Sequence, residues 1–175
     1  MAFDGFVMKK IINELNFSIL DSKVNKIFSP TKNDIVFNLY SLGKTYNLLI
    51  NVSAENCRIC NSDFQRKNPL SPSNFCMLLR KYLTGSRIIS FNTYGLERVV
   101  EIEFECYSEG SGITTKKVIA EIMNRYSNII LANSDNTIIG SLKYCGKSIY
   151  TLPNSNKENL LEISSFDEFL EILKN

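Results

Sequence analysis

Residues 117–144 read KVIAEIMNRYSNIILANSDNTIIGSLKY and hold three short apolar runs separated by polar residues. The first run, 118–120, leads to a polar corner at 124–128, and the second, 129–132, leads to a turn rich in Asn, Ser and Asp. Short β-branched runs between such clusters are typical of strands joined by tight turns. The stretch therefore predicts a β-meander in the middle of a sheet, with functional side chains at its polar corner.

The flanking sequence predicts helices and further strands. Asp4 can cap a first helix whose apolar face holds Phe3, Val7, Ile11 and Leu15, and a second helix begins at Ser73 or Asn74 and stops at Gly85. Strands are expected at 24–28, 34–39, 45–52, 88–91 and 99–106, whereas 56–74 is expected to be irregular. These elements predict an α+β fold, with antiparallel β-sheets packed in a sandwich-like manner and helices beside them.

The strand at 99–106 has a clean alternation. Val100, Ile102, Phe104 and Cys106 alternate with Glu101, Glu103 and Glu105. Because successive side chains of a strand point to opposite faces, the first set is expected in the core and the glutamates on a solvated face. Lys116 and Lys117 follow after a hairpin connection, so the glutamates are expected to pair with them across strands.

Composition indicates a soluble globular protein. The chain has 175 residues, 44% of them hydrophobic, a mean hydropathy of -0.07 and a net charge of +2. No apolar run reaches the roughly 20 residues of a membrane helix, and the N-terminus lacks the pattern of a secretory signal, so we expect a cytoplasmic protein without membrane contact. Residues 57–98 hold seven basic and two acidic side chains, which fits either an anionic polymer as partner or ordinary surface charge.

Several kinds of chemistry are excluded or disfavoured. The chain has no His, which removes His-based acid–base catalysis and His metal ligands. Its five Cys include one CxxC pair, Cys57 and Cys60, where a structural zinc site needs four ligands. No phosphate-binding glycine loop is present. We therefore expect no catalytic residue, no metal and no cofactor.

Two arginines stand out at predicted strand ends. Glu97-Arg98 follows a turn and opens a strand, and Arg125 lies in the polar corner. Either guanidinium can bind a phosphate or stack on a base, or can instead form a structural ion pair. Glu121, flanked by apolar residues, needs a partner if it is buried. Arg98 or Arg125 is the simplest such partner, which would join two strand ends in one polar cluster.

Five segments together resemble the N-terminal domain of the NFACT family, whose bacterial members are the RqcH/FbpA-type proteins, often labelled fibronectin-binding. The segments are MAFDG (1–5), NKIFSP (25–30), FCMLLRK (75–81), GLER (95–98) and EIMNRYSNIIL (121–131). The resemblance runs from Met1 to about residue 153. It implies a domain at 1–153, followed by a connector and short helix at 154–175 that lead towards modules outside this chain.

The resemblance implies a non-enzymatic, RNA-binding ribosome quality control factor. Such proteins bind large ribosomal subunits, and thus rRNA, that carry stalled nascent chains, and they recruit alanyl-tRNA for C-terminal alanine tailing. The family's tRNA-binding Asp-Arg pair matches Glu97 and Arg98 here, with a longer acid. The family's Glu-Ile-Met run matches Glu121, Ile122 and Met123, followed by Arg125. These residues, with Arg80 and Lys81 of the predicted second helix, are the expected RNA or ribosome contacts, although basic residues near a helix C-terminus also suit the helix dipole.

The resemblance further implies a fold similar to the N-terminal domain of formamidopyrimidine-DNA glycosylases. Those enzymes use an N-terminal Pro followed by Glu, whereas this chain has Ala2 and Phe3 after Met1, so the nucleophile is missing. A DNA-processing enzyme is therefore disfavoured. The remaining alternative is a fibronectin-binding surface adhesin, against which the missing signal peptide argues.

Overall fold

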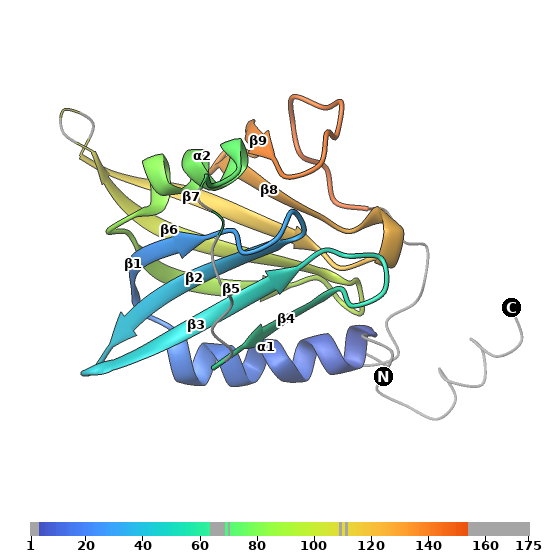
Figure 1. Ribbon diagram of the computed structural model, residues 1–175, viewed down its shortest axis with the longest axis horizontal. Coiled ribbons are helices and arrows are strands. Elements are labelled where there is room, and N and C mark those ends of the chain that lie inside the picture. Colours follow the sequence, from blue (N-terminus) through green and yellow to red (C-terminus); the bar gives the residue numbers. More distant parts are fainter. Residues whose placement is uncertain (1–3, 64–68, 70, 109, 111, 154–175) are drawn as a thin grey trace, which may run out of the picture.

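A nine-stranded antiparallel sheet and two α-helices form the domain in the computed structural model, which describes residues 4–63, 69, 71–108, 110 and 112–153 (Figure 1). The strand order is β4-β3-β2-β1-β5-β6-β7-β8-β9. The helices are α1 (Gly5–Ile19) and α2 (Asn74–Leu83). The strands are β1 (Lys23–Phe28), β2 (Asp34–Ser41), β3 (Lys44–Asn51), β4 (Arg58–Asn61), β5 (Arg87–Thr93), β6 (Val99–Ser108), β7 (Gly112–Glu121), β8 (Asn128–Asn133) and β9 (Ile138–Ser141).

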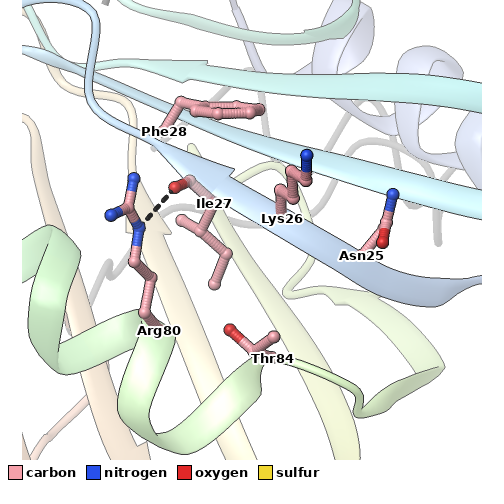
Figure 2. Close-up of a pocket in the computed structure, with 6 residues that line it drawn as sticks. All are labelled: Asn25, Lys26, Ile27, Phe28, Arg80 and Thr84. Carbon is pink, nitrogen blue, oxygen red and sulfur yellow. Dashed lines mark hydrogen bonds between the residues drawn. The ribbon is translucent and has the colours of Figure 1, made fainter.

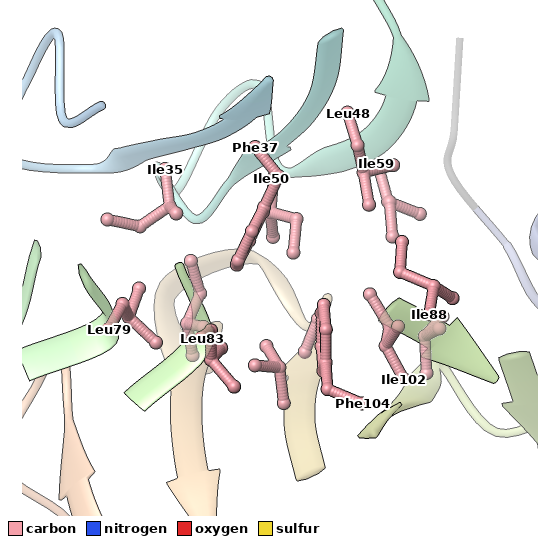
Figure 3. Packing of buried hydrophobic residues seen from close by; sticks show 14 of the residues in the cluster. Ile35, Phe37, Leu48, Ile50, Ile59, Leu79, Leu83, Ile88, Ile102 and Phe104 are labelled. Atoms are coloured by element: carbon pink, nitrogen blue, oxygen red, sulfur yellow. The ribbon is translucent and has the colours of Figure 1, made fainter. Parts of the chain in front are cut away.

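The α+β class is confirmed, but the predicted separate sheets are one continuous sheet that bends between β1 and β5. These strands share a single ladder pair, Lys23 with Arg87, and further backbone hydrogen bonds join 21–24 to 85–88. Beyond the bend, β2, β3 and β4 lie opposite β5, β6 and α2 (Figure 3). The rings of Phe37 and Phe104 stack across the core with centroids 5.7 Å apart. The arrangement is therefore sandwich-like although only one sheet makes it.

The helices close the two open sides of this folded sheet. α1 packs against β4 and β5, and α2 packs against β1, β6 and β9. The predicted cap Asp4 is confirmed, since its carboxylate accepts from the amide of Val7 at 2.9 Å. Of the two residues predicted to start the second helix, Ser73 is the cap, and its hydroxyl accepts from the amide of Cys76 at 3.2 Å. The predicted apolar face of α1 is confirmed in part: Leu15 is buried and Ile11 packs against the core, whereas Val7 is half-buried and Phe3 lies outside the described residues. The other buried side chains of α1 are Met8, Ile12 and Ile19.

Besides the main core, a smaller apolar cluster lies on the outer face of the sheet, which was expected to be exposed to solvent. Val99, Ile119, Ile130 and Ala132 are covered there by Tyr150. The segment that carries Tyr150 returns over the sheet, and Thr137 forms a bridge with Ile149. This covering segment explains why side chains on both faces of β7 and β8 are buried.

The expectation of a fully solvated acidic face on β6 was consequently wrong. Glu101 is only 6% exposed and lies 3.4 Å from the ammonium of Lys117, which also lies 3.9 Å from Glu103. Glu105 pairs instead with Arg87 at 2.8 Å. Cross-strand pairing is thus confirmed for Lys117, where it compensates the burial of Glu101. The ammonium of Lys116, which was expected to pair in the same way, instead donates to Asn133 at 2.7 Å.

Candidate nucleic-acid interface

The two strand ends singled out in the sequence lie side by side. Val99 opposes Glu121 at the paired ends of β6 and β7, and the carbonyl of Arg98 accepts from the amide of Ile122 at 2.8 Å. The turn at 94–98 and the corner at 122–127 therefore share one end of the sheet, at the right of Figure 1, where α1 also begins. We call Glu97, Arg98, Glu121, Met123 and Arg125 the sheet-end site.

The turn that carries Glu97 and Arg98 is held by its own backbone and by α1. The amide of Glu97 donates to the carbonyl of Tyr94 at 2.9 Å, and Gly95 has a φ of +54°. A Cβ placed on Gly5 would lie 2.1 Å from the carbonyl oxygen of Leu96, so the start of α1 fits against the turn only as glycine. The backbone that presents Arg98 is therefore fixed.

The side chains of Glu97 and Arg98 are half-buried. They do not form the ion pair with each other that was the structural alternative to a binding role. Among the described residues neither forms an ion pair or a side-chain hydrogen bond. Arg98 thus has a complete guanidinium available for a partner outside this chain.

The polar corner forms a short 3-10 turn, η1 (Asn124–Tyr126), rather than a simple loop. Asn124 begins it with a φ of +51°, and the Ser127 hydroxyl accepts from the amide of Met123 at 2.8 Å. Arg125 is exposed; its guanidinium carbon lies 4.7 Å from the centroid of the Tyr126 ring, and Nη2 donates to the Tyr126 hydroxyl at 2.7 Å. Tyr126 is itself 68% exposed. Together they present a guanidinium and an aromatic ring, both suited to phosphates and bases.

The partner of Glu121 is Tyr150, not Arg98 or Arg125 as the sequence had led us to expect. The Tyr150 hydroxyl donates to Oε1 of Glu121 at 3.1 Å. Burial raises the pKa of Glu121, while this hydrogen bond and the positive charge of Lys147 act in the opposite direction. The pKa of Tyr150 is also raised, first by burial and then by Glu121. Glu121 is therefore tied to the segment that covers the outer face.

Ile122 and Met123 shape the site from within. Ile122 is 0% exposed and belongs to the main core, and Met123 packs against the outer apolar cluster. The side chain of Ile122 thus offers no surface to a partner and instead fixes the corner against the core.

Arg80 and Lys81 lie apart from the sheet-end site, on α2. Nε of Arg80 donates to the carbonyl of Ile27 on β1 at 2.7 Å. Lys81 is exposed, with its ammonium 5.3 Å from the centroid of the Tyr82 ring. No described hydrogen bond or ion pair joins these two residues to the sheet-end site, so the predicted contacts form two groups.

Sequence reasoning missed Lys143 and Tyr144, which lie beside the corner. The side chain of Asn128 accepts from the amide of Lys143 at 2.8 Å and donates to its carbonyl at 2.9 Å. Tyr144 follows and is 97% exposed. The sequence did contain a signal for a binding role, a basic residue followed by an aromatic one shortly after Gly140. Their position beside the corner could not be predicted, because it depends on the hydrogen bonds between Asn128 and Lys143.

The described residues show neither a metal-binding cluster nor a membrane-spanning helix. No group of three or more Cys, Asp or Glu residues in those parts of the chain is arranged to hold a metal ion. Neither α1 nor α2 has the length and apolar character that crossing a lipid bilayer requires.

Comparison with known proteins identifies a family. Residues 4–175 match the family described as NFACT N-terminal and middle domains. The chain is 35% identical over 150 residues to the Rqc2 homolog RqcH of Bacillus subtilis, which covers 85% of this chain and 26% of that protein. It is 26% identical over 142 residues to the human ribosome quality control complex subunit NEMF, and this match covers 81% of this chain and 12% of that protein. The chain thus spans about a quarter of its bacterial relative.

The fold is shared with a solved structure. The N-terminal domain of fibronectin-binding protein PavA from Streptococcus pneumoniae superimposes with a TM-score of 0.91 at 30% identity, covering 99% of this chain and 69% of that one. The resemblance drawn from five short segments is thereby confirmed: over residues 4–175 the protein belongs to the NFACT family, within its N-terminal and middle domains.

Proposed function

We propose that this chain is the RNA-binding domain of a ribosome quality control factor, with tRNA as the ligand of the sheet-end site. The observation that carries the proposal is the placement of Arg98 and Arg125 at one end of the sheet, neither of them paired with a carboxylate among the described residues. Unpaired arginines beside an exposed aromatic ring suit an RNA with accessible phosphates and bases. The names of the relatives from Bacillus subtilis and human support the ribosomal setting.

In the proposed setting the domain acts in the cytoplasm on a large ribosomal subunit with a stalled nascent chain. Its sheet-end site contacts alanyl-tRNA, and rRNA is contacted by the same surface or by the basic residues of α2. The domain supports alanine tailing by placing the tRNA and performs no chemical step itself. The proposed likeness to the N-terminal domain of formamidopyrimidine-DNA glycosylases concerns the fold and does not extend to their catalysis.

The test is tRNA binding by the 175-residue chain at about 50 mM and about 200 mM salt, where phosphate contacts lose much of their affinity. Arg98→Ala and Arg125→Ala should each weaken binding and make the slope of log affinity against log salt shallower by about 0.7–0.9. Arg87→Ala is the matched control. It also removes one arginine, but Arg87 lies at the start of β5, at the opposite end of the β5–β6 ladder from the sheet-end site, and pairs there with Glu105. Equal affinity in all four proteins would contradict the proposal.

A second candidate is fibronectin binding, favoured by the structural likeness to PavA, a fibronectin-binding protein. Immobilised fibronectin should then retain the chain at physiological salt. Retention that survives Arg98→Ala and Arg125→Ala, together with no affinity for tRNA, would favour this candidate over the first.

A further inference from the structure

A pocket of about 300 Å³ opens between β1 and α2, and none of its lining residues belongs to the sheet-end site (Figure 2). Its lining residues come from one stretch of β1 and from the second half of α2 and its cap: Asn25, Lys26, Ile27, Phe28, Arg80 and Thr84. Along this stretch β1 is no longer paired with β5. The two strands meet only around Lys23 and Arg87 in the described chain, and the β1–β2 register shifts between Val24 and Lys26.

Arg80 enters this pocket with most of its donors unused. Its Nε is held by the carbonyl of Ile27 at 2.7 Å, and Nη1 has a weak contact with the sulfur of Met77 at 3.9 Å. In the described part of the chain, neither terminal nitrogen donates to a protein oxygen or joins a carboxylate in an ion pair. Figure 2 shows both terminal nitrogens extending away from α2.

The helix dipole alone does not account for this arrangement. A basic side chain near a helix C-terminus interacts favourably with the dipole through its charge, and it can also bind the last carbonyls of its own helix. Arg80 instead reaches across to β1, and its own carbonyl is satisfied by the amide of Thr84 at 3.2 Å. The hydrogen bond to Ile27 therefore orients the guanidinium without using its forked end.

The other polar groups of the pocket complement an anion. Lys26 brings a second positive charge from an exposed position on β1, and Thr84 brings an exposed hydroxyl. Of the described residues that line the pocket, none is acidic. A guanidinium fork with an ammonium and a hydroxyl matches the oxygens of a phosphate, and the volume admits a phosphate with an attached sugar.

We propose that this pocket binds a phosphate group, with the terminal nitrogens of Arg80 and the ammonium of Lys26 as its main donors and Thr84 as an additional one. The phosphate comes either from the backbone of an RNA strand or from a free phosphate compound. The RNA source rests on the function proposed above, whereas phosphate binding itself does not.

The experiment is an NMR titration of the isotope-labelled chain with inorganic phosphate and, separately, with a single-stranded uridine oligonucleotide. Saturable shifts of the amides of residues 25–28 and of Thr84 are expected with at least one of the two. Lys26→Ala should weaken that binding by about tenfold, the loss of one charge-assisted contact. Lys23→Ala is the matched control, an exposed lysine on the same strand that does not line the pocket, and should bind as the parent does.

Arg80→Lys gives an independent check, since lysine keeps the charge and can still reach Ile27 but lacks the fork. It should bind weakly while the spectrum outside the pocket stays unchanged. If α2 is disturbed instead, Lys26→Ala and Thr84→Ala, both at exposed positions, still decide the question. No saturable response to either probe, or an equal loss in Lys23→Ala and Lys26→Ala, would overturn the proposal.

The two sources are separated by the oligonucleotide. If Lys26→Ala weakens both inorganic phosphate and the oligonucleotide, the pocket holds an RNA phosphate; if it weakens inorganic phosphate alone, the pocket serves a free phosphate compound. Arg98→Ala and Arg125→Ala are titrated in parallel with tRNA. Their unchanged affinity would refute the sheet-end site while leaving a pocket response intact.

Discussion

The amide of Ile122 donates to the carbonyl of Arg98 at 2.8 Å, one step beyond the last ladder pair of β6 and β7. Ile122 is fixed in the core, so this bond fixes the position from which the Arg98 side chain leaves the sheet. Arg125 follows three residues after Ile122 on a 3-10 turn. The spacing of the two arginines is therefore set by the backbone.

The Tyr126 ring provides a test of stacking at the corner. Tyr126→Ala should weaken tRNA binding by about 1–3 kcal/mol, the range for a base stacked on an aromatic ring. Tyr126→Phe keeps the ring beneath Arg125 and loses only the hydroxyl that accepts from Nη2, so it should retain most of the affinity. Filter binding at fixed salt measures both. A phenylalanine variant as weak as the alanine variant would show that the hydroxyl, not the ring, is needed.

Gly5→Ala tests whether the start of α1 supports the turn before Arg98. The new Cβ would lie 2.1 Å from a backbone oxygen of Leu96, which cannot rotate away. We expect a loss of about 1–3 kcal/mol in unfolding free energy, as for overpacked sites, together with weaker tRNA binding. Urea denaturation and the same binding assay measure the two effects.

Gly140→Ala is the control for that substitution. Its Cβ would lie 2.4 Å from Cδ2 of Leu78, the end of a side chain that can change rotamer. Stability should fall less than in Gly5→Ala, and tRNA binding should not change. Equal loss of tRNA affinity in both variants would mean that the overlap at Leu96 has no special effect on the site.

Asn128→Ala should remove the support for the segment that begins at Lys143. The buried amide serves both the N–H and the carbonyl of Lys143, and its oxygen also accepts from Ile129 at 2.9 Å. Leaving these groups unpaired should cost about 1–3 kcal/mol of unfolding free energy in urea. Asn92→Ala, whose exposed amide contacts only Ser90 among the described residues, should stay within about 0.5 kcal/mol of the parent.

The pH dependence of stability should report on Glu121. Its pKa is raised above the ordinary value of 4.5, first of all by burial, so the folded state holds a proton that the unfolded state has released. The contribution to stability is therefore fully present below pH 4.5 and is lost as the pH rises through the folded pKa.

Glu121→Gln removes this titration. The variant should be more stable than the parent at pH 7, and the difference should vanish as the pH falls below 4.5; thermal melts across this range measure it. Tyr150→Phe deletes the hydrogen bond that lowers the pKa of Glu121, so the pKa of Glu121 in the folded state should rise further. The fall in stability should then continue to a higher pH than in the parent. Parallel stability curves for parent and Glu121→Gln would contradict the assignment.

Much of the fold follows from local sequence. The alternation along 99–106 predicted which side chains of β6 enter the core, and Asp4 and Ser73 predicted both helix starts. The missed strand β4 has only four residues, within a stretch with two prolines that was expected to be irregular. The helix predicted from the capping box at 165–168 lies outside the described residues.

The parts that could not be predicted depend on contacts between distant segments. Nothing in the alternation of β6 reveals that the segment carrying Tyr150 returns over the outer face, where it covers an apolar cluster and gives Glu121 a tyrosine partner. The meeting of the Arg98 turn with the corner could be predicted, because a hairpin brings the start of β6 to the end of β7. That neither guanidinium joins a carboxylate of the described residues could be learned only from the three-dimensional arrangement.

The bend between β1 and β5 also has a consequence for how the chain acquires its structure. On each side of the bend, strands pair with their sequence neighbours, so β1–β4 and β5–β9 are two meanders of local contacts. Local pairing forms early, whereas joining distant segments is slow. During synthesis the first meander would emerge with Phe37 and its neighbours uncovered until Phe104 on β6 had left the ribosome. A chaperone that shields nascent apolar surface is therefore most needed between these two events.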